Sequence, residues 1–275
     1  MPPRAIDLLV LSDLHLGTFG CHATELVQYL HSIQPKIVVL NGDIIDVWNF
    51  NKNYFPPEHW LVIERVIDWA SKGVKVHYIT GNHDEIMRRF VPMRLANFEL
   101  EDKVLLQIDG QQVWIFHGDV FDVSIKISKT LARLGGKGYD WLIWGNRLVN
   151  TLLGYLGKPP MSFSKKVKDS IKRAVKYIDD FEQTAAELAI EKGYDYVVCG
   201  HIHQPQMRTI STAAGSVTYL NSGDWVENLS SLEYYDHAWH LYYYTQDENT
   251  PTQTPIAPPQ QLPSYEKLVS RITAL

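Results

Sequence analysis

The chain has 275 residues, 45% of them hydrophobic, and a formal net charge of −5 at pH 7. This length allows one large domain or two small ones, and the apolar content suffices for a sizeable core, which excludes disorder as the default. A net negative charge argues against general nucleic-acid binding by the whole surface, so no nucleic-acid partner is expected.

Cysteine content and apolar runs indicate the compartment. Cys21 and Cys199 are the only cysteines, too few for a disulfide framework, which favours a reducing compartment such as the cytoplasm. The first apolar run, residues 6–11, is too short for a secretory signal, and no stretch approaches the roughly 20 apolar residues that a membrane span needs. We therefore expect a soluble cytoplasmic protein, which could still lie on a membrane surface.

Strand and helix patterns alternate over residues 5–118. Apolar residues at helical spacing predict helices over 23–33 and 58–71. Pro35 prevents the first helix from continuing into the strand that follows, and Gly73 ends the second. This part of the chain therefore predicts strands joined by helical crossovers.

The pattern changes from about residue 120, after a predicted hairpin. An Asp-Gly pair at 109–110 suits a tight turn, so a β-hairpin is predicted over 104–116. From about 120 to 192 the pattern is mostly helical, without a convincing strand, and we interpret it as an insertion. Strand patterns return at 194–199, 217–220 and 238–244.

The chain end has a different composition. Residues 247–263 are rich in Pro, Thr and Gln, which is typical of an extended linker, and 265–275 could form a short helix that either docks or frays. We therefore predict one domain over 1–246, including the insertion at about 120–192, and a tail over 247–275.

Five apolar, β-branched segments each run directly into residues that bind metals. In an α/β sheet, groups placed just beyond strand ends gather around one point. Carboxylate and imidazole together suit Mn, Fe or Zn better than Mg or Ca. The candidate ligands are Asp13, His15, Asp43, Asn82, His117, His201 and His203.

Seven groups are more than one tetrahedral ion needs, so we expect two divalent cations sharing Asp43, about 3.5–4 Å apart. Such a pair lowers the pKa of a bridging water and orients its attack on phosphorus, which predicts hydrolysis of a phosphate ester or anhydride. The alternative, a structural ion, would favour four Cys or His ligands.

Local sequence also predicts how the ligands are presented. Asp13 and His15 alternate around Leu14, so an extended strand end would point both polar side chains one way and Leu14 into the core. Gly42 precedes Asp43 and lets the backbone turn sharply there.

His83 follows the candidate ligand Asn82 and would lie beside the metals without binding them. We interpret it as a catalytic acid that protonates the leaving oxygen, with Asp84 orienting the imidazole and raising its pKa. The plainer alternative is a structural loop histidine.

The insertion carries charge opposite to the rest of the chain. Residues 120–176 hold twelve basic and three acidic residues, a net charge of +9, so the remainder carries −14. An apolar stripe that includes Trp141 and Trp144 precedes a basic run, a combination that would suit acyl chains and pyrophosphate at a lipid surface. The basic candidates for substrate contact are Lys165, Lys166, Lys168, Lys172 and Arg173. The stripe could instead pack on the domain or form a dimer interface, so the oligomeric state is left open.

Asp-Leu-His, Gly-Asp, Gly-Asn-His-Asp, His-Gly-Asp and Gly-His-Ile-His occur in this order and resemble the motif set of the calcineurin-like metallophosphoesterase superfamily, over about residues 5–245. The resemblance implies an α/β (α+β) fold, a four-layer αββα β-sandwich flanked by helices, with the helical insertion as a cap. It places His83 at the proton-donor position. It implies one metal bound by Asp13, His15, Asp43 and His203, and another bound by Asp43, Asn82, His117 and His201.

Within the superfamily the chain is most similar to the UDP-2,3-diacylglucosamine diphosphatase branch of lipid A biosynthesis. The shared features are Ser-Asp-Leu-His-Leu-Gly, the segment 42–48 and the helical insertion after residue 119. This implies hydrolysis of a nucleotide-linked glycolipid to UMP and lipid X, usually with Mn, and peripheral contact with the cytoplasmic face of the inner membrane. The chain departs at His83, where some members carry Arg.

Two other functions are weighed against this one. A phosphodiesterase or phosphatase could act on another nucleotide or on a phosphoprotein, although phosphoprotein phosphatases of the superfamily usually have Glu where Asp84 stands. A non-catalytic scaffold should have lost ligands, yet every ligand position is filled here.

Overall fold

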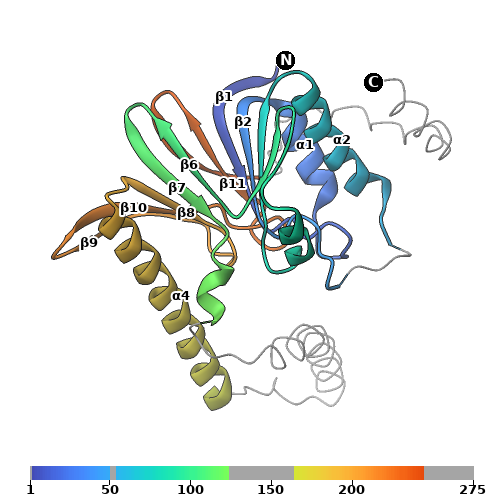
Figure 1. Cartoon of the computed structure of the whole chain (residues 1–275). Coiled ribbons are helices and arrows are strands. Elements are labelled where there is room, and N and C mark those ends of the chain that lie inside the picture. Colours follow the sequence, from blue (N-terminus) through green and yellow to red (C-terminus); the bar gives the residue numbers. More distant parts are fainter. Residues whose placement is uncertain (1, 50–53, 124–163, 245–275) are drawn as a thin grey trace, which may run out of the picture.

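The computed structural model describes residues 2–49, 54–123 and 164–244, which form two β-sheets packed face to face (Figure 1). The first sheet has seven strands in the order β12-β11-β1-β2-β3-β5-β4. Its strands are β1 (Arg4–Leu11), β2 (Ile33–Asn41), β3 (Lys75–Ile79), β4 (Met93–Leu95), β5 (Phe98–Glu101), β11 (Ser230–Tyr235) and β12 (Ala238–Tyr243). β1 pairs in parallel with β2 and antiparallel with β11.

The second sheet has five strands in the order β6-β7-β8-β10-β9. These are β6 (Lys103–Ile108), β7 (Gln111–Phe116), β8 (Tyr196–Cys199), β9 (Gln206–Thr212) and β10 (Gly215–Asn221). β6 and β7 form the predicted hairpin, and Asp109 and Gly110 at its turn both have positive φ, as a tight turn with an Asp-Gly pair requires.

Helices cover the outer faces of both sheets (Figure 1). They are α1 (Ala23–Ser32), α2 (Pro57–Ser71) and α4 (Ser164–Lys192), with short 3-10 helices η1 (Glu85–Phe90) and η2 (Asp119–Val123). Gly73, with φ of 93°, ends α2 as predicted, and Val74 N–H closes the last turn on the Trp69 carbonyl at 3.0 Å. β2 begins at Ile33, before Pro35 rather than after it, because α1 already ends at Ser32.

Three separate apolar cores lie between the four layers. One joins α1 and α2 to the first sheet around Trp69, a second lies between the sheets around Val198, and a third joins α4 to the second sheet around Phe181. This confirms the predicted αββα sandwich. No helix in the described ranges is long and apolar enough to cross a membrane. Residues 124–163 of the predicted insertion and the tail from 245 onward lie outside the described residues.

Candidate dinuclear metal site

The loop after β1 presents Asp13 and His15 through left-handed backbone. β1 ends at Leu11, and the two ligands have φ of 53° and 50°, so the predicted extended strand end is wrong. Leu14 between them is nevertheless fully buried, as predicted. Left-handed conformations cost free energy in non-glycine residues, and at a functional site the surrounding structure must enforce them.

The loop after β2 provides that restraint. Asp13 N–H donates to the Gly42 carbonyl and His15 N–H donates to the Asp43 carbonyl, both at 3.0 Å. Asp43 also has a positive φ, and Gly42 before it has φ of 81°, as the predicted sharp turn requires. The two loops therefore run side by side at the same edge of the sheet.

Asp13, His15 and His203 form the first cluster of candidate ligand atoms. One ligand atom from each lies within 4.8 Å of the others. His203 Nε2 is 3.2 Å from Asp13 Oδ1 and 3.4 Å from His15 Nε2. Imidazole nitrogens and a carboxylate oxygen converging in this way are suited to share a cation.

Asp43, His117 and His201 form the second cluster, again within 4.8 Å. His117 Nδ1 is 2.8 Å from the Asn41 carbonyl and donates to it, so in the neutral imidazole Nε2 is the nitrogen without a proton. That Nε2 is 3.3 Å from Asp43 Oδ2. The hydrogen bond to Asn41 thus fixes the tautomer that a metal ligand needs.

The residues on either side of Asn82 place its loop beside Asp43. His83 N–H donates to Asp43 Oδ1 at 2.8 Å, so the loop after β3 lies against Asp43. A Cβ at Gly81 would lie 2.2 Å from Asp43 Oδ1, which is too close. Any residue other than glycine at this position would therefore displace the Asp43 carboxylate. The structure therefore brings six of the seven predicted ligands to one end of the sandwich in two groups of three, and the loop that carries the seventh, Asn82, lies against Asp43.

Three predicted ligand atoms make no hydrogen bond of normal geometry among the described residues, although two of them have the ion-pair contacts given above with His203 and Asp43. Asp13 Oδ1, Asn82 Oδ1 and His117 Nε2 are all buried from solvent. A buried polar atom without a partner is costly, and native structures rarely keep one without a reason. Divalent cations bound between the two clusters would satisfy all three, so the residues present fit the predicted metals.

The electrostatics of the site favour positive charge. Burial opposes protonation of His117, but the carboxylates of Asp43 and Asp13 outweigh it and raise its pKa to about 10. Burial likewise opposes protonation of His203, and Asp13 raises its pKa to about 9. Burial raises the pKa of Asp13, yet His203 dominates and lowers it to about 2. The negative potential that holds these protons would equally attract cations.

Asp46 links the first cluster to His83. Its Oδ2 lies 3.1 Å from His15 Nδ1, and its Oδ1 lies 3.0 Å from His83 Nδ1. Burial opposes protonation of His83, but Asp46 and Asp43 raise its pKa above the ordinary value. Sequence analysis missed Asp46, although an acid three residues after Asp43, in the same loop, was a signal that could have found it.

The prediction that Asp84 orients His83 is therefore wrong. Asp84 is fully buried, and its Oδ2 accepts hydrogen bonds from Tyr78 Oη–H at 2.6 Å and Ile44 N–H at 3.0 Å. Its Oδ1 accepts from Gly81 N–H at 2.6 Å. Asp84 therefore stabilises the loop that carries Asn82, through hydrogen bonds from two backbone N–H groups and a phenol. The carboxylate that contacts the His83 imidazole is that of Asp46.

The α4 helix passes beside the second cluster. The ring of Phe181 is centred 6.1 Å from that of His201, and Tyr177 Oη is 3.5 Å from His201 Nε2. Trp141 and Trp144, predicted to contact substrate, lie outside the described residues. The basic candidates belong to the first turns of α4, where the structure does not describe side chains: Lys165, Lys166, Lys168, Lys172 and Arg173.

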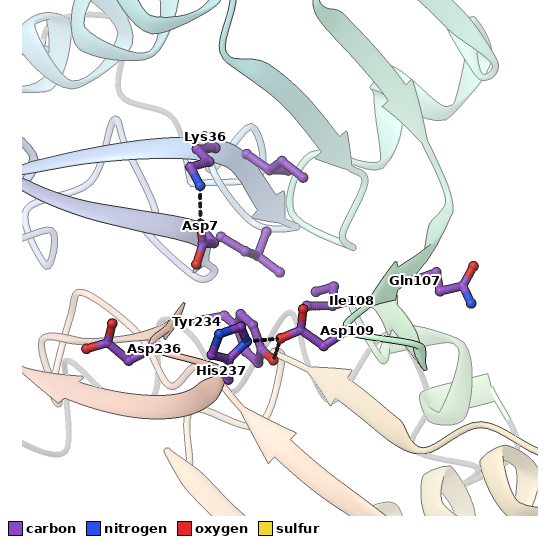
Figure 2. Close-up of a pocket in the computed structure, with 10 residues that line it drawn as sticks. Asp7, Lys36, Gln107, Ile108, Asp109, Tyr234, Asp236 and His237 are labelled. Carbon is purple, nitrogen blue, oxygen red and sulfur yellow. Dashed lines mark hydrogen bonds and ion pairs between the residues drawn. The ribbon is translucent and has the colours of Figure 1, made fainter.

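A separate pocket of about 540 Å³ opens at the opposite end of the strands. Figure 2 shows Asp109, at the tip of the β6–β7 hairpin, meeting Tyr234 and His237; the distances are 2.6 and 2.7 Å. Lys36 and Asp7 form an ion pair of 2.6 Å on another part of the wall. The predicted ligands are not among the residues that line this pocket, so it is no part of the metal site.

Comparisons with known proteins show the family of the chain. A family model described as calcineurin-like phosphoesterase matches residues 6–205. A UDP-2,3-diacylglucosamine hydrolase from Aliivibrio fischeri is 25% identical over 242 residues, covering 86% of this chain and 98% of the relative. One from Nitrosococcus oceani is 24% identical over 245 residues, covering 84% and 92%.

Among solved structures, the phosphoesterase Yfce from E. coli covers 86% of this chain and 99% of its own, with 14% identity and a TM-score of 0.42. The family match alone spans most of the chain. The chain therefore belongs to the calcineurin-like phosphoesterase family and is a phosphoester-hydrolysing enzyme, and the family implies divalent metal ions.

Proposed function

From membership in this family, we propose that the enzyme hydrolyses the pyrophosphate of UDP-2,3-diacylglucosamine, releasing UMP and 2,3-diacylglucosamine 1-phosphate. The observation that carries this proposal is the pair of adjacent ligand clusters, Asp13–His15–His203 and Asp43–His117–His201. The substrate is supported by relatives that bear this activity in their names and align over more than four-fifths of the chain.

The ligand assignment follows the two clusters. We assign Asp13, His15 and His203 to one ion and Asn82, His117 and His201 to the other, with Asp43 shared between them. When bound, two such cations, Mn by preference, would supply a water of lowered pKa and neutralise phosphate oxygens. His117 and His203 must lose their protons to bind, and their neighbouring carboxylates then hold the metal charge.

His83 is assigned the proton transfer to the leaving oxygen. Its imidazole is held by Asp46 and lies edge-on to His15, with ring centroids 4.7 Å apart, so it is beside the ligands without being one of them. Its carboxylate neighbours raise its pKa and so favour the protonated imidazole, the form that general acid catalysis requires.

The lipid part of the substrate is assigned to the insertion. The charge of +9 over residues 120–176 complements a pyrophosphate and anionic headgroups. α4 includes the end of this basic segment, and Tyr177, the next residue along the helix, lies 3.5 Å from His201 Nε2 of the second cluster. We accordingly place the enzyme at the cytoplasmic face of the inner membrane, bound through the insertion.

The test is hydrolysis of UDP-2,3-diacylglucosamine in mixed detergent micelles, followed by UMP release. The wild type should release UMP with Mn²⁺ and lose turnover after chelation, and Asp43→Asn should be inactive yet folded. Turnover of small phosphodiesters alone, with the lipid substrate inert, would show that the proposed substrate is wrong.

A further inference from the structure

Arg88, in the last turn of η1, contacts two loops that carry predicted ligands of the same ion. Its Nη2 donates to Asp119 Oδ2 at 2.6 Å and to the Thr80 carbonyl at 3.3 Å. Its Nε donates to Thr80 Oγ1 at 3.1 Å. Thr80 and Asp119 are buried, whereas the Arg88 side chain is 36% exposed, so these contacts are partly shielded from water. One planar guanidinium making three such bonds is held in a single orientation.

The two partners lie next to metal ligands along the chain. The Thr80 carbonyl is two residues before Asn82, and Asp119 is two residues after His117. Only one residue separates Thr80 from Asn82 and Asp119 from His117, so a displacement of either partner is passed to the ligand over a short stretch of backbone. Arg88 is not itself a metal ligand, because a guanidinium is positively charged and has no acceptor atom.

The two ligand loops are also hydrogen-bonded to a third segment, β2 and the loop after it. Asn82 is tied to the loop after β2, because the next residue donates to Asp43 Oδ1. His117 is tied to the end of β2 through the Asn41 carbonyl. Both ligand loops are thus fixed to β2 and its loop, and Arg88 supplies the direct link between them. Without that link the separation of the two loops would be set only indirectly, through their contacts with β2 and the loop after it.

We propose that Arg88 is a positioning residue that sets the separation of Asn82 and His117 and thereby the affinity of the second metal position. The proposal rests on the dinuclear site of the proposed function, and is independent of which phosphate ester is the substrate. It predicts a selective effect, because the ligands of the first cluster, around Asp13, are held by other contacts.

The test compares Arg88→Ala and Arg88→Lys with Arg94→Ala, an exposed arginine whose ion pair is with Glu99, 3.7 Å away. Equilibrium dialysis measures Mn²⁺ stoichiometry and affinity, and electron paramagnetic resonance reports the coupling between two bound Mn²⁺ ions. Arg88→Ala should bind the first ion normally and the second roughly 10–100-fold more weakly, which is typical when a group supporting a ligand is lost.

The variants separate positioning from a general loss of structure. Arg88→Lys should recover part of the affinity for the second ion. An ammonium can reach Asp119 but cannot also make the two hydrogen bonds to Thr80. Arg94→Ala should match the wild type. In a double-mutant cycle of Arg88→Ala and Asp119→Asn, the double variant should bind the second Mn²⁺ ion as tightly as Arg88→Ala alone. If Arg88→Ala does not fold, Arg88→Gln replaces it.

Three outcomes overturn the proposal: an unchanged second affinity in a folded variant, equal weakening of both ions, or a wild type that binds fewer than two. A wild type that binds two ions but leaves UDP-2,3-diacylglucosamine intact would refute only the substrate. The Mn²⁺ affinities of the Arg88 variants would then still test whether Arg88 positions the ligands.

Discussion

Metal binding should displace about two protons from the site at pH 7.5. His117, with a pKa of about 10, and His203, with a pKa of about 9, are both protonated at this pH when no cation is present. A metal binds only neutral imidazole, so both protons must leave. At pH 10 most of the His203 sites and about half of the His117 sites are already neutral, so the release should fall below about one proton.

Isothermal titration of the chelator-treated protein with Mn²⁺, in buffers of different ionisation enthalpy, measures this number. His203→Asn should release about one proton fewer, whereas His237→Ala, an exposed histidine at the far end of the sandwich, should match the wild type. Release of no proton at pH 7.5 would refute the reasoning, since the two imidazoles would then already be neutral.

The same groups predict how pH affects the stability of the metal-free protein. A histidine whose pKa is raised on folding stabilises fully below its unfolded value of about 6.5, and this contribution is lost as pH rises through the folded pKa. The stabilisation from His203 should therefore be lost between about pH 6.5 and about pH 9, and that from His117 between about pH 6.5 and about pH 10. Urea unfolding at pH 7 and pH 10 measures it, and saturating Mn²⁺ should remove the difference.

Three further predictions concern groups around the ligands. His83→Ala should slow turnover of poor leaving groups by roughly 10²–10⁴-fold and spare a highly activated ester; equal loss for both would argue against proton transfer. Asp46→Asn should lower kcat and weaken metal binding roughly 10–100-fold, because it orients both His83 and His15; unchanged affinity would exclude that role. Gly81→Ala should abolish tight binding of metal, since its Cβ would lie 2.2 Å from an oxygen of Asp43; normal metal content would contradict the close approach.

The regular elements were predictable where apolar periodicity was strong, and were missed where it was not. β11 was overlooked because its sequence contains two serines and Glu233, which do not indicate a buried strand. Arg4 makes a bidentate ion pair with Glu233 at 2.7 Å, and Tyr29 donates to the same carboxylate at 2.7 Å. A buried charge is tolerated only with such partners, which come from distant segments.

The sequence by itself determined the chemistry of the site, because the ligand types are local: each apolar strand is followed at once by an oxygen or nitrogen donor. Only the tertiary structure decided which acid serves which histidine. Asp84 is adjacent to His83 in sequence but accepts bonds from Tyr78 and Ile44, whereas Asp46 reaches His83 across two loops. Hydrogen bonds depend on distance and direction in space, and sequence neighbours in a tight loop often point apart.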